Sequence, residues 1–208
     1  MNWAARRHDL VDRLADREDV DDQRVLAALR SVPRHRFVPA ESREAAYDDR
    51  PLSIGEGQTV SAPHMVAVMA DLLDLAPGDA VLEVGTGCGY HAAVTADIVG
   101  AEHVHSVEYR ERLAERARET LAGTGDGAVS VRVGDGREGW PEHAPYDRAY
   151  LTCAAEQFPP AVVEQVRLGG LLVAPIGDRR QVLVRARRRA DGSLDRERHG
   201  GVRFVEMQ

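Results

Sequence analysis

The sequence predicts an α/β protein: a doubly wound, mainly parallel sheet with an N-terminal helical extension. From residue 62 onward, apolar runs of strand type alternate with helical patterns, which is typical of a sheet covered by helices on both faces. The first run, VLEV, breaks into a loop with three glycines, as at the ligand-binding turns of such sheets. The first third of the chain shows mainly helical spacing. We therefore expect a single domain, in which residues 1–60 pack on a core of residues 61–208.

The N-terminal elements follow from amphipathic spacing and from proline. Two helices are predicted over residues 3–15 and 22–30, and the two prolines of SVPRHRFVP prevent the second from continuing. A short helical piece near 41–47 precedes the loop DDRPLSIGEGQ. The next helix begins at Ala62, with Pro63 at an early position that tolerates proline.

The remaining elements alternate along the chain. The predicted strands are 80–84, 103–107, 129–133, 146–152, 170–176 and 181–186, and the predicted helices lie near 89–99, 110–122 and 160–166. A solvated hairpin is expected in 185–198, around an Asp-Gly turn. In such sheets ligands bind beyond the carboxyl ends of the strands, so the loops after residues 84, 107, 133 and 152 should converge on one pocket.

Composition limits the classes of function. The net charge is −7, and all 27 basic residues are arginine, because the chain has no lysine. An acidic chain with scattered arginines argues against nucleic-acid binding, which needs a clustered basic face. Cys88 and Cys153 have no metal-ligand spacing, and the first residues resemble neither a signal peptide nor a membrane span. We expect a cytoplasmic monomer without a metal or a membrane partner.

The glycine loop distinguishes between cofactors. Gly85, Gly87 and Gly89 have the spacing G-x-G-x-G, and Tyr90 stands where the dinucleotide fingerprint G-x-G-x-x-G has its third glycine. Glu83 precedes the loop, and a carboxylate directed at the ligand would repel a pyrophosphate but suit an ammonium group. The pattern therefore favours S-adenosylmethionine over a nicotinamide dinucleotide.

Two further acids follow the next strands. Glu108 ends HVHSVE, where these folds place a carboxylate that accepts hydrogen bonds from ribose hydroxyls, although nicotinamide sites share this feature. Asp135 follows VRV, with Gly136 beside it, so its carboxylate could accept from an adenine amino group. Each acid alone could be a cap or a solvated loop residue, but three acids at successive strand ends form a constellation.

The chain resembles the protein-L-isoaspartate O-methyltransferases from about position 20 to its end. The segments that carry the resemblance are VPRHRFVP, AYDDRPLSIGEGQTVSAPHMVAVM, VLEVGTGCGYHAAV, VGDG, YDRAYLT and GVRFV, of which GQTVSAPHM is the specific one. The resemblance implies a Rossmann-like class I methyltransferase. It also implies methyl transfer from S-adenosylmethionine to the free α-carboxylate of isoaspartyl residues in proteins and peptides, a repair reaction.

The resemblance assigns site residues by position. It implies that Ser61 is the active-site serine within an active-site loop that ends the N-terminal segment. The predicted cofactor contacts are Gln58, Thr59, Val60, Ser61, Glu83, Gly85, Thr86, Gly87, Gly89, Glu108, Tyr109, Asp135, Gly136 and Thr152. The acceptor is already ionised at neutral pH, so no general base is needed and a serine hydroxyl can donate to it.

Several alternatives stay open at this stage. Thr59 or Ser61 could instead cap the helix that begins at Ala62, and His64 could face the pocket or solvent. The sequence departs from the family pattern at Glu156, where the family has proline, and in the final EMQ, so a different acceptor is the main rival function. A non-catalytic S-adenosylmethionine-binding protein is a further rival, and the intact GQTVSAPHM argues against it.

Overall fold

The structure is a computed structural model that describes residues 1–208. Its helices are α1 (Trp3–Ala15), α2 (Gln23–Ser31), α3 (Pro63–Leu73), α4 (Tyr90–Val99), α5 (Glu111–Thr124) and α6 (Pro160–Gln165). Five 3₁₀ turns supplement them: η1 (Arg34–Arg36), η2 (Ala40–Ala45), η3 (Ala101–His103), η4 (Gly136–Glu138) and η5 (Pro141–His143). None of the helices combines the length and the apolar character that crossing a bilayer requires.

The strands form one large sheet and one hairpin. They are β1 (Leu52–Gly55), β2 (Gln58–Val60), β3 (Val81–Val84), β4 (Val104–Glu108), β5 (Ser130–Val133), β6 (Tyr146–Leu151), β7 (Val166–Ile176), β8 (Gln181–Arg188) and β9 (Leu194–Val202). The large sheet has the order β5-β4-β3-β6-β7-β8-β9. Neighbours from β5 to β7 run parallel, whereas β8 and β9 are antiparallel additions at one edge. The chain order reverses between β3 and β6, and this is where a ligand site is expected.

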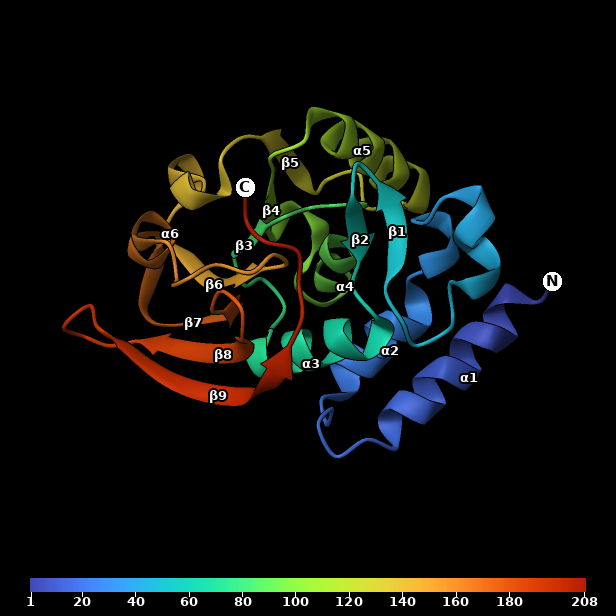
Figure 1. Ribbon diagram of the computed structural model, residues 1–208, viewed down its shortest axis with the longest axis horizontal. Coiled ribbons are helices and arrows are strands. Elements are labelled where there is room, and N and C mark those ends of the chain that lie inside the picture. Colours follow the sequence, from blue (N-terminus) through green and yellow to red (C-terminus); the bar gives the residue numbers. More distant parts are fainter.

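Two layers of helices enclose the sheet (Figure 1). One apolar cluster joins β3, β6 and β7 to α2, α3, α4 and α5, and it includes the buried residues of α1. A second cluster covers the other face, where α6 packs against β3, β6 and β7. Central strands buried on both faces read as continuous apolar runs, which explains why VLEV and YDRAYL lack a simple alternation.

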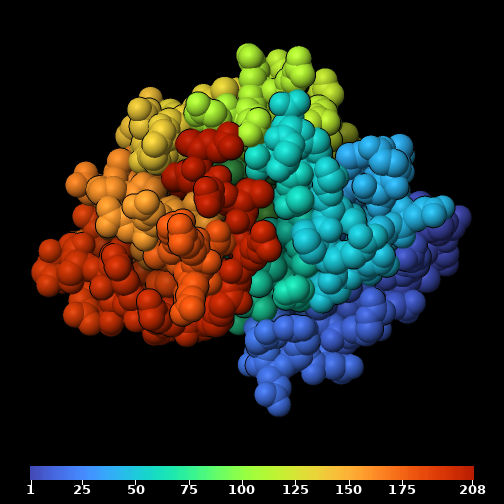
Figure 2. Space-filling view, in the orientation of Figure 1, coloured from blue at the N-terminus to red at the C-terminus, as the bar shows by residue number.

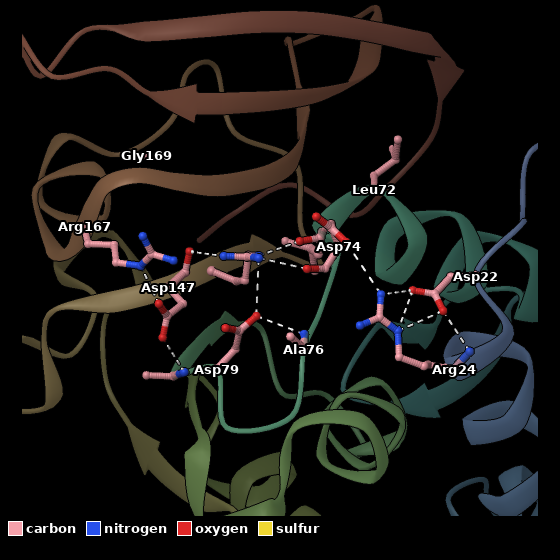
Figure 3. A network of polar contacts seen from close by, with 12 residues as sticks. Asp22, Arg24, Leu72, Asp74, Ala76, Asp79, Asp147, Arg167 and Gly169 are labelled. Atoms are coloured by element: carbon pink, nitrogen blue, oxygen red, sulfur yellow. Dashed lines mark hydrogen bonds and ion pairs between the residues drawn. The ribbon is translucent and has the colours of Figure 1, made fainter.

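The amino end of the sheet is fixed by a polar network (Figure 3). Arg148 donates to the carbonyl oxygens of Leu73 (2.6 Å) and Asp74 (2.8 Å) and lies 3.4 Å from Asp79. Asp147 accepts from the backbone N–H of Ala80 at 2.9 Å. These contacts attach the end of α3 to β3 and β6, so the acids at this end of the sheet have a structural role. The opposite, carboxyl end is the one left for a ligand.

The predicted fold class is confirmed, and most elements lie within two residues of their expected bounds. The hairpin expected in 185–198 is present as β8 and β9. One prediction was wrong: the segment read as the loop DDRPLSIGEGQ contains β1 and the first residue of β2, and these two strands pair as an antiparallel hairpin. Gly55, Glu56 and Gly57 all adopt positive φ at its turn. Strands of four and three residues are too short for a clear alternating pattern.

Candidate active site

A cavity opens at the carboxyl ends of β3, β4 and β6, under the β1–β2 hairpin. Its lining comprises Ile54, Gln58, Thr59, Val84, Gly85, Gly87, Val107, Glu108, Tyr109, Arg110, Leu113, Gly136, Thr152, Cys153, Val205, Glu206, Met207 and Gln208. The predicted convergence of the loops after these strands is therefore confirmed in the structure. Eight of the fourteen predicted cofactor contacts line the cavity: Gln58, Thr59, Gly85, Gly87, Glu108, Tyr109, Gly136 and Thr152.

The glycine loop turns the chain sharply from β3 into α4. Gly85, Gly87 and Gly89 have φ values of 99°, 57° and 87°, in a region that residues with a Cβ atom seldom adopt. The side chain of Thr152, at the end of β6, contacts the loop by donating to the carbonyl oxygen of Gly85 at 2.5 Å. Gly89 lies against Leu121 of α5, where an added Cβ would have a neighbour at 3.2 Å. The glycine spacing thus serves both the turn and its close packing.

Glu108 connects this loop to the next strand. Its side chain accepts from the backbone N–H of Gly87 at 2.8 Å and from that of Arg110 at 2.9 Å. The residue is only 6% exposed and faces the cavity. Each carboxylate oxygen has a further lone pair, so Glu108 can accept hydrogen bonds from a ligand without breaking either contact.

Asp135 is placed differently from its neighbour Gly136. Gly136 lines the cavity, and an added Cβ there would overlap Val84. The carboxylate of Asp135 instead forms a two-pronged contact with Arg137, at 2.9 Å to Nε and 2.7 Å to Nη2. The hydrogen bonds from Arg137 lower the pKa of Asp135 below its usual range. The predicted contact of Asp135 with adenine stays a prediction.

The expected orientation of Glu83 was wrong. The residue is fully buried and does not line the cavity. Its carboxyl oxygens accept from Ser106 at 2.5 Å and from Tyr150 at 2.9 Å, and burial raises its pKa to about 8. Side chains alternate along β3, so Glu83 faces the α4 side while Val84 faces the cavity.

Glu83 still supports the glycine loop from behind. Ser106 lies 2.5 Å from the hydroxyl of Thr86, which is the residue between Gly85 and Gly87. On the other side, the hydroxyl of Tyr150 lies 3.1 Å from that of Thr95 in α4. The predicted contact residue Thr86 is therefore buried in this network and does not line the cavity.

Three predicted residues of the loop around β2 differ in their placement. Val60 packs in the apolar core, whereas Gln58 and Thr59 line the cavity. Ser61 is half-buried next to them, and its hydroxyl has no hydrogen-bond partner in the chain. Helix α3 begins at Pro63 with Ala62 as its N-cap and no side-chain cap, so the alternative capping role of Thr59 or Ser61 is wrong.

His64 belongs to the support of this loop. Its Nδ1 lies 2.8 Å from the carboxylate of Asp49, which also accepts from the backbone N–H of His64 at 2.9 Å. The ring therefore faces the 49–51 segment that leads into β1. This contact fixes the start of α3 relative to the hairpin.

The sequence interpretation missed the C-terminal residues of the cavity. Val205–Gln208 cross the site between the hairpin and the segment after β6, as Figure 2 shows in red between cyan and orange. The backbone of Ala154 pairs with this segment through Val205 and Met207, both at 2.8 Å, and Arg110 donates to the side chain of Gln208 at 2.7 Å. No local pattern in RFVEMQ indicates these long-range contacts.

This C-terminal segment narrows the cavity. Its volume is about 70 Å³, whereas pockets for small-molecule ligands usually measure roughly 300 to 1,000 Å³. A nucleoside-sized ligand can fill the site only if part of the lining moves outward. The lining itself suits such a ligand, because the glycine loop exposes backbone and Glu108 offers free acceptor positions.

Comparison with known proteins gives the family. A model of the family described as protein-L-isoaspartate(D-aspartate) O-methyltransferase matches residues 5–208. The chain belongs to this family. Protein-L-isoaspartate O-methyltransferase 2 of Archaeoglobus fulgidus is 48% identical over all of this chain and 95% of its own length. The protein-L-isoaspartate O-methyltransferase of Methanopyrus kandleri is 49% identical over 97% of this chain and 90% of its own.

Solved structures of protein-L-isoaspartate O-methyltransferases share the fold. One matches with a TM-score of 0.88 at 30% identity, over 96% of this chain; the chain spans 65% of that longer protein. Another, a Plasmodium falciparum protein described as a putative member in complex with S-adenosyl-L-homocysteine, matches with a TM-score of 0.85 at 25% identity and 97% coverage. The protein that carries this cavity, at the carboxyl ends of β3, β4 and β6, thus belongs to a family that uses S-adenosylmethionine.

Proposed function

We infer that this protein is an S-adenosylmethionine-dependent protein-L-isoaspartate O-methyltransferase. It methylates the free carboxylate of isoaspartyl residues in proteins and peptides, which is a repair reaction. Family membership over residues 5–208 supports this function. The structural observation that carries it is the single cavity in which the glycine loop and Glu108 meet the Gln58–Thr59 edge of the hairpin.

We propose that the cofactor contacts are those predicted from the sequence, with three changes. The first is that Val60, which packs in the apolar core, is not a contact. Glu108, Gly136 and the backbone of the glycine loop would hold the nucleoside part, since they line the cavity. Glu83 and Thr86 would act indirectly, by fixing the loop through Ser106. Arg110, which the sequence analysis did not single out, joins the set because it lines the cavity beside Glu108.

The reaction needs alignment more than proton transfer. When bound, S-adenosylmethionine supplies an electrophilic methyl group on a positively charged sulfur. An acceptor carboxylate oxygen forms the new O–CH₃ bond, the S–CH₃ bond breaks, and its electron pair stays on sulfur, so both charges disappear. The carboxylate is ionised near neutral pH, and no side chain of this chain has to remove a proton. Excluding water and orienting the acceptor remain for the protein to do.

We propose that Ser61 orients the acceptor carboxylate. Its hydroxyl is unpaired in the chain. The residue is not part of the cavity lining itself, but it lies two positions after Thr59, which is. A hydrogen bond from a neutral hydroxyl to a carboxylate compensates for part of the desolvation of that charge. His64 is engaged with Asp49 and is assigned no part in the chemistry.

Glu156 bears on the alternative that the acceptor is different. The residue is exposed, and it lies outside the cofactor cavity, in a neighbouring depression. The carboxylate is solvated and lies outside the cavity in which methyl transfer would take place. This observation favours the isoaspartyl acceptor over a reworked site.

We further propose that the protein is cytoplasmic and acts as a monomer. Its N-terminal segment, 1–60, and its core, 61–208, form one folding unit. One apolar cluster contains residues of both segments, and the two cysteines are free. Analytical ultracentrifugation would reveal a stable dimer as a species of twice the chain's 22.8 kDa mass.

The decisive experiment for the function uses paired peptides. The two peptides have the same sequence and differ only in an isoaspartyl or a normal aspartyl linkage, and the methyl group of the cofactor carries the label. Base-labile methyl ester in the isoaspartyl peptide alone is the expected result. Equal labelling of both peptides, or of neither, would contradict the proposed acceptor.

A further inference from the structure

Two depressions flank the cofactor cavity on either side of the C-terminal segment. The larger one is a groove of about 1380 Å³ that shares five residues with the cofactor cavity: Gln58, Thr59, Val205, Glu206 and Gln208. The smaller one measures about 430 Å³ and shares Glu206 and Met207 with that cavity. An extended peptide that presents its central residue to the cofactor cavity would place its flanking residues over these two depressions.

Three arginines line the larger groove and not the smaller one. Arg179, Arg180 and Arg203 are exposed, and none of their side chains forms a hydrogen bond or an ion pair with another part of the chain. Two arginines of the neighbouring strands do have ion-pair partners: Arg185 pairs with Glu197, and Arg167 with Asp147. No ion pair engages the three groove arginines, and they outnumber the two acids of the groove, Asp178 and Glu206, although the protein as a whole has a net charge of −7.

The smaller depression has the opposite character. Glu156 lines this depression and not the larger groove, and the one arginine of the depression, Arg137, is paired with Asp135 at 2.7 Å. Asp178 and Glu206 line both depressions and so lie at their boundary. The charge along the surface thus changes from positive at the arginines to negative at Glu156.

We propose that Arg179, Arg180 and Arg203 determine substrate specificity, by favouring peptides with acidic residues on one side only of the isoaspartyl residue. This inference rests on the proposed function. An extended chain advances about 3.3 Å per residue, so side chains two or three positions from the isoaspartyl residue lie about 7 to 10 Å away. The same acidic residues on the other side would approach Glu156 and be disfavoured. Each exposed ion pair between a groove arginine and an acidic side chain of the peptide should change kcat/KM by roughly 1.5- to 5-fold.

The test uses isoaspartyl peptides of identical composition and opposite order. One peptide carries two glutamates before the isoaspartyl residue and two arginines after it, and the other has the two flanks exchanged. Because both peptides have the same net charge, attraction to the whole protein cannot distinguish them. The wild-type protein is expected to prefer one order by about 3- to 20-fold in kcat/KM at low salt. The preference should fade near 1 M salt, where the Debye length is about 3 Å.

Variants assign the preference to the groove. In Arg179→Gln/Arg203→Gln the ratio of the two kcat/KM values should fall toward 1, while affinity for S-adenosylhomocysteine stays unchanged. Arg13→Gln/Arg43→Gln is the matched control, because it removes the same charge from two exposed arginines of the N-terminal segment and should keep the ratio.

The outcomes separate this inference from the proposed function. Equal methylation of both orders by the wild-type protein would overturn the inference and leave the isoaspartyl function intact. A preference that persists in the groove variant would overturn it as well. Failure to methylate either isoaspartyl peptide, or a neutral one, would instead contradict the proposed function.

Discussion

Replacement of the buried Glu83 by glutamine should change how the stability of the protein depends on pH. The side chain is fully buried, with Ser106 and Tyr150 as its hydrogen-bond partners, and burial raises its pKa from the usual 4.5 to about 8. In the folded protein the carboxyl group therefore keeps its proton across the range in which an unfolded chain loses it. Stability from this group is fully present below pH 4.5 and is lost as pH rises toward 8.

The magnitude follows from the difference between the two pKa values. A shift of about 3.5 units corresponds to about 5 kcal/mol in total, at 1.36 kcal/mol per unit. Roughly three quarters of this loss falls between pH 5 and pH 8. Glutamine has nearly the same shape and cannot ionise: its amide N–H can donate to Ser106, and its oxygen can accept from Tyr150. The free energy of unfolding of Glu83→Gln should thus rise relative to wild type by about this amount over the same interval.

Urea denaturation at pH 5, 6, 7 and 8 measures this difference, because other titrating groups are common to both proteins. Glu115→Gln, at an exposed position of α5, controls for the loss of a carboxylate as such and should follow the wild-type profile. Parallel profiles for wild type and Glu83→Gln would show that Glu83 is not held protonated in the folded state, and the account of this network would be wrong.

Three other variants test the site. Ser61→Ala should lower kcat by roughly 10- to 150-fold, which corresponds to the loss of one hydrogen bond to a charged group, while the affinity for S-adenosylhomocysteine stays the same. An equal loss of kcat and of this affinity would indicate a structural role. Glu108→Gln should weaken S-adenosylhomocysteine binding by a similar factor, measured by calorimetry, and unchanged affinity would remove Glu108 from the cofactor site. Deletion of residues 205–208, which narrow the cavity, should speed S-adenosylhomocysteine association in stopped-flow fluorescence. An unchanged association rate would mean that this segment does not obstruct entry.

The fold class and the end of the sheet that carries the site could both be predicted from the sequence. Strand runs that alternate with helices require parallel crossovers, and parallel strands bring their carboxyl ends together. The position of Glu108 beside Gly87 follows from this rule, because β3 and β4 are adjacent and parallel. The spacing of Gly85, Gly87 and Gly89 likewise indicated a turn that only glycine adopts readily, and all three have positive φ.

Tertiary structure alone decided which way Glu83 points and what covers the cavity. In VLEV both faces of the strand are buried, so the pattern of apolar residues does not reveal which side chains face the ligand. Only the packing of β3 against Tyr150 and Ser106 fixes that direction. The cover formed by residues 205–208 depends on contacts with Ala154 and Arg110, about 50 and 100 residues away in the sequence. Such pairings depend on how distant segments meet in space, and no local pattern of residues encodes them.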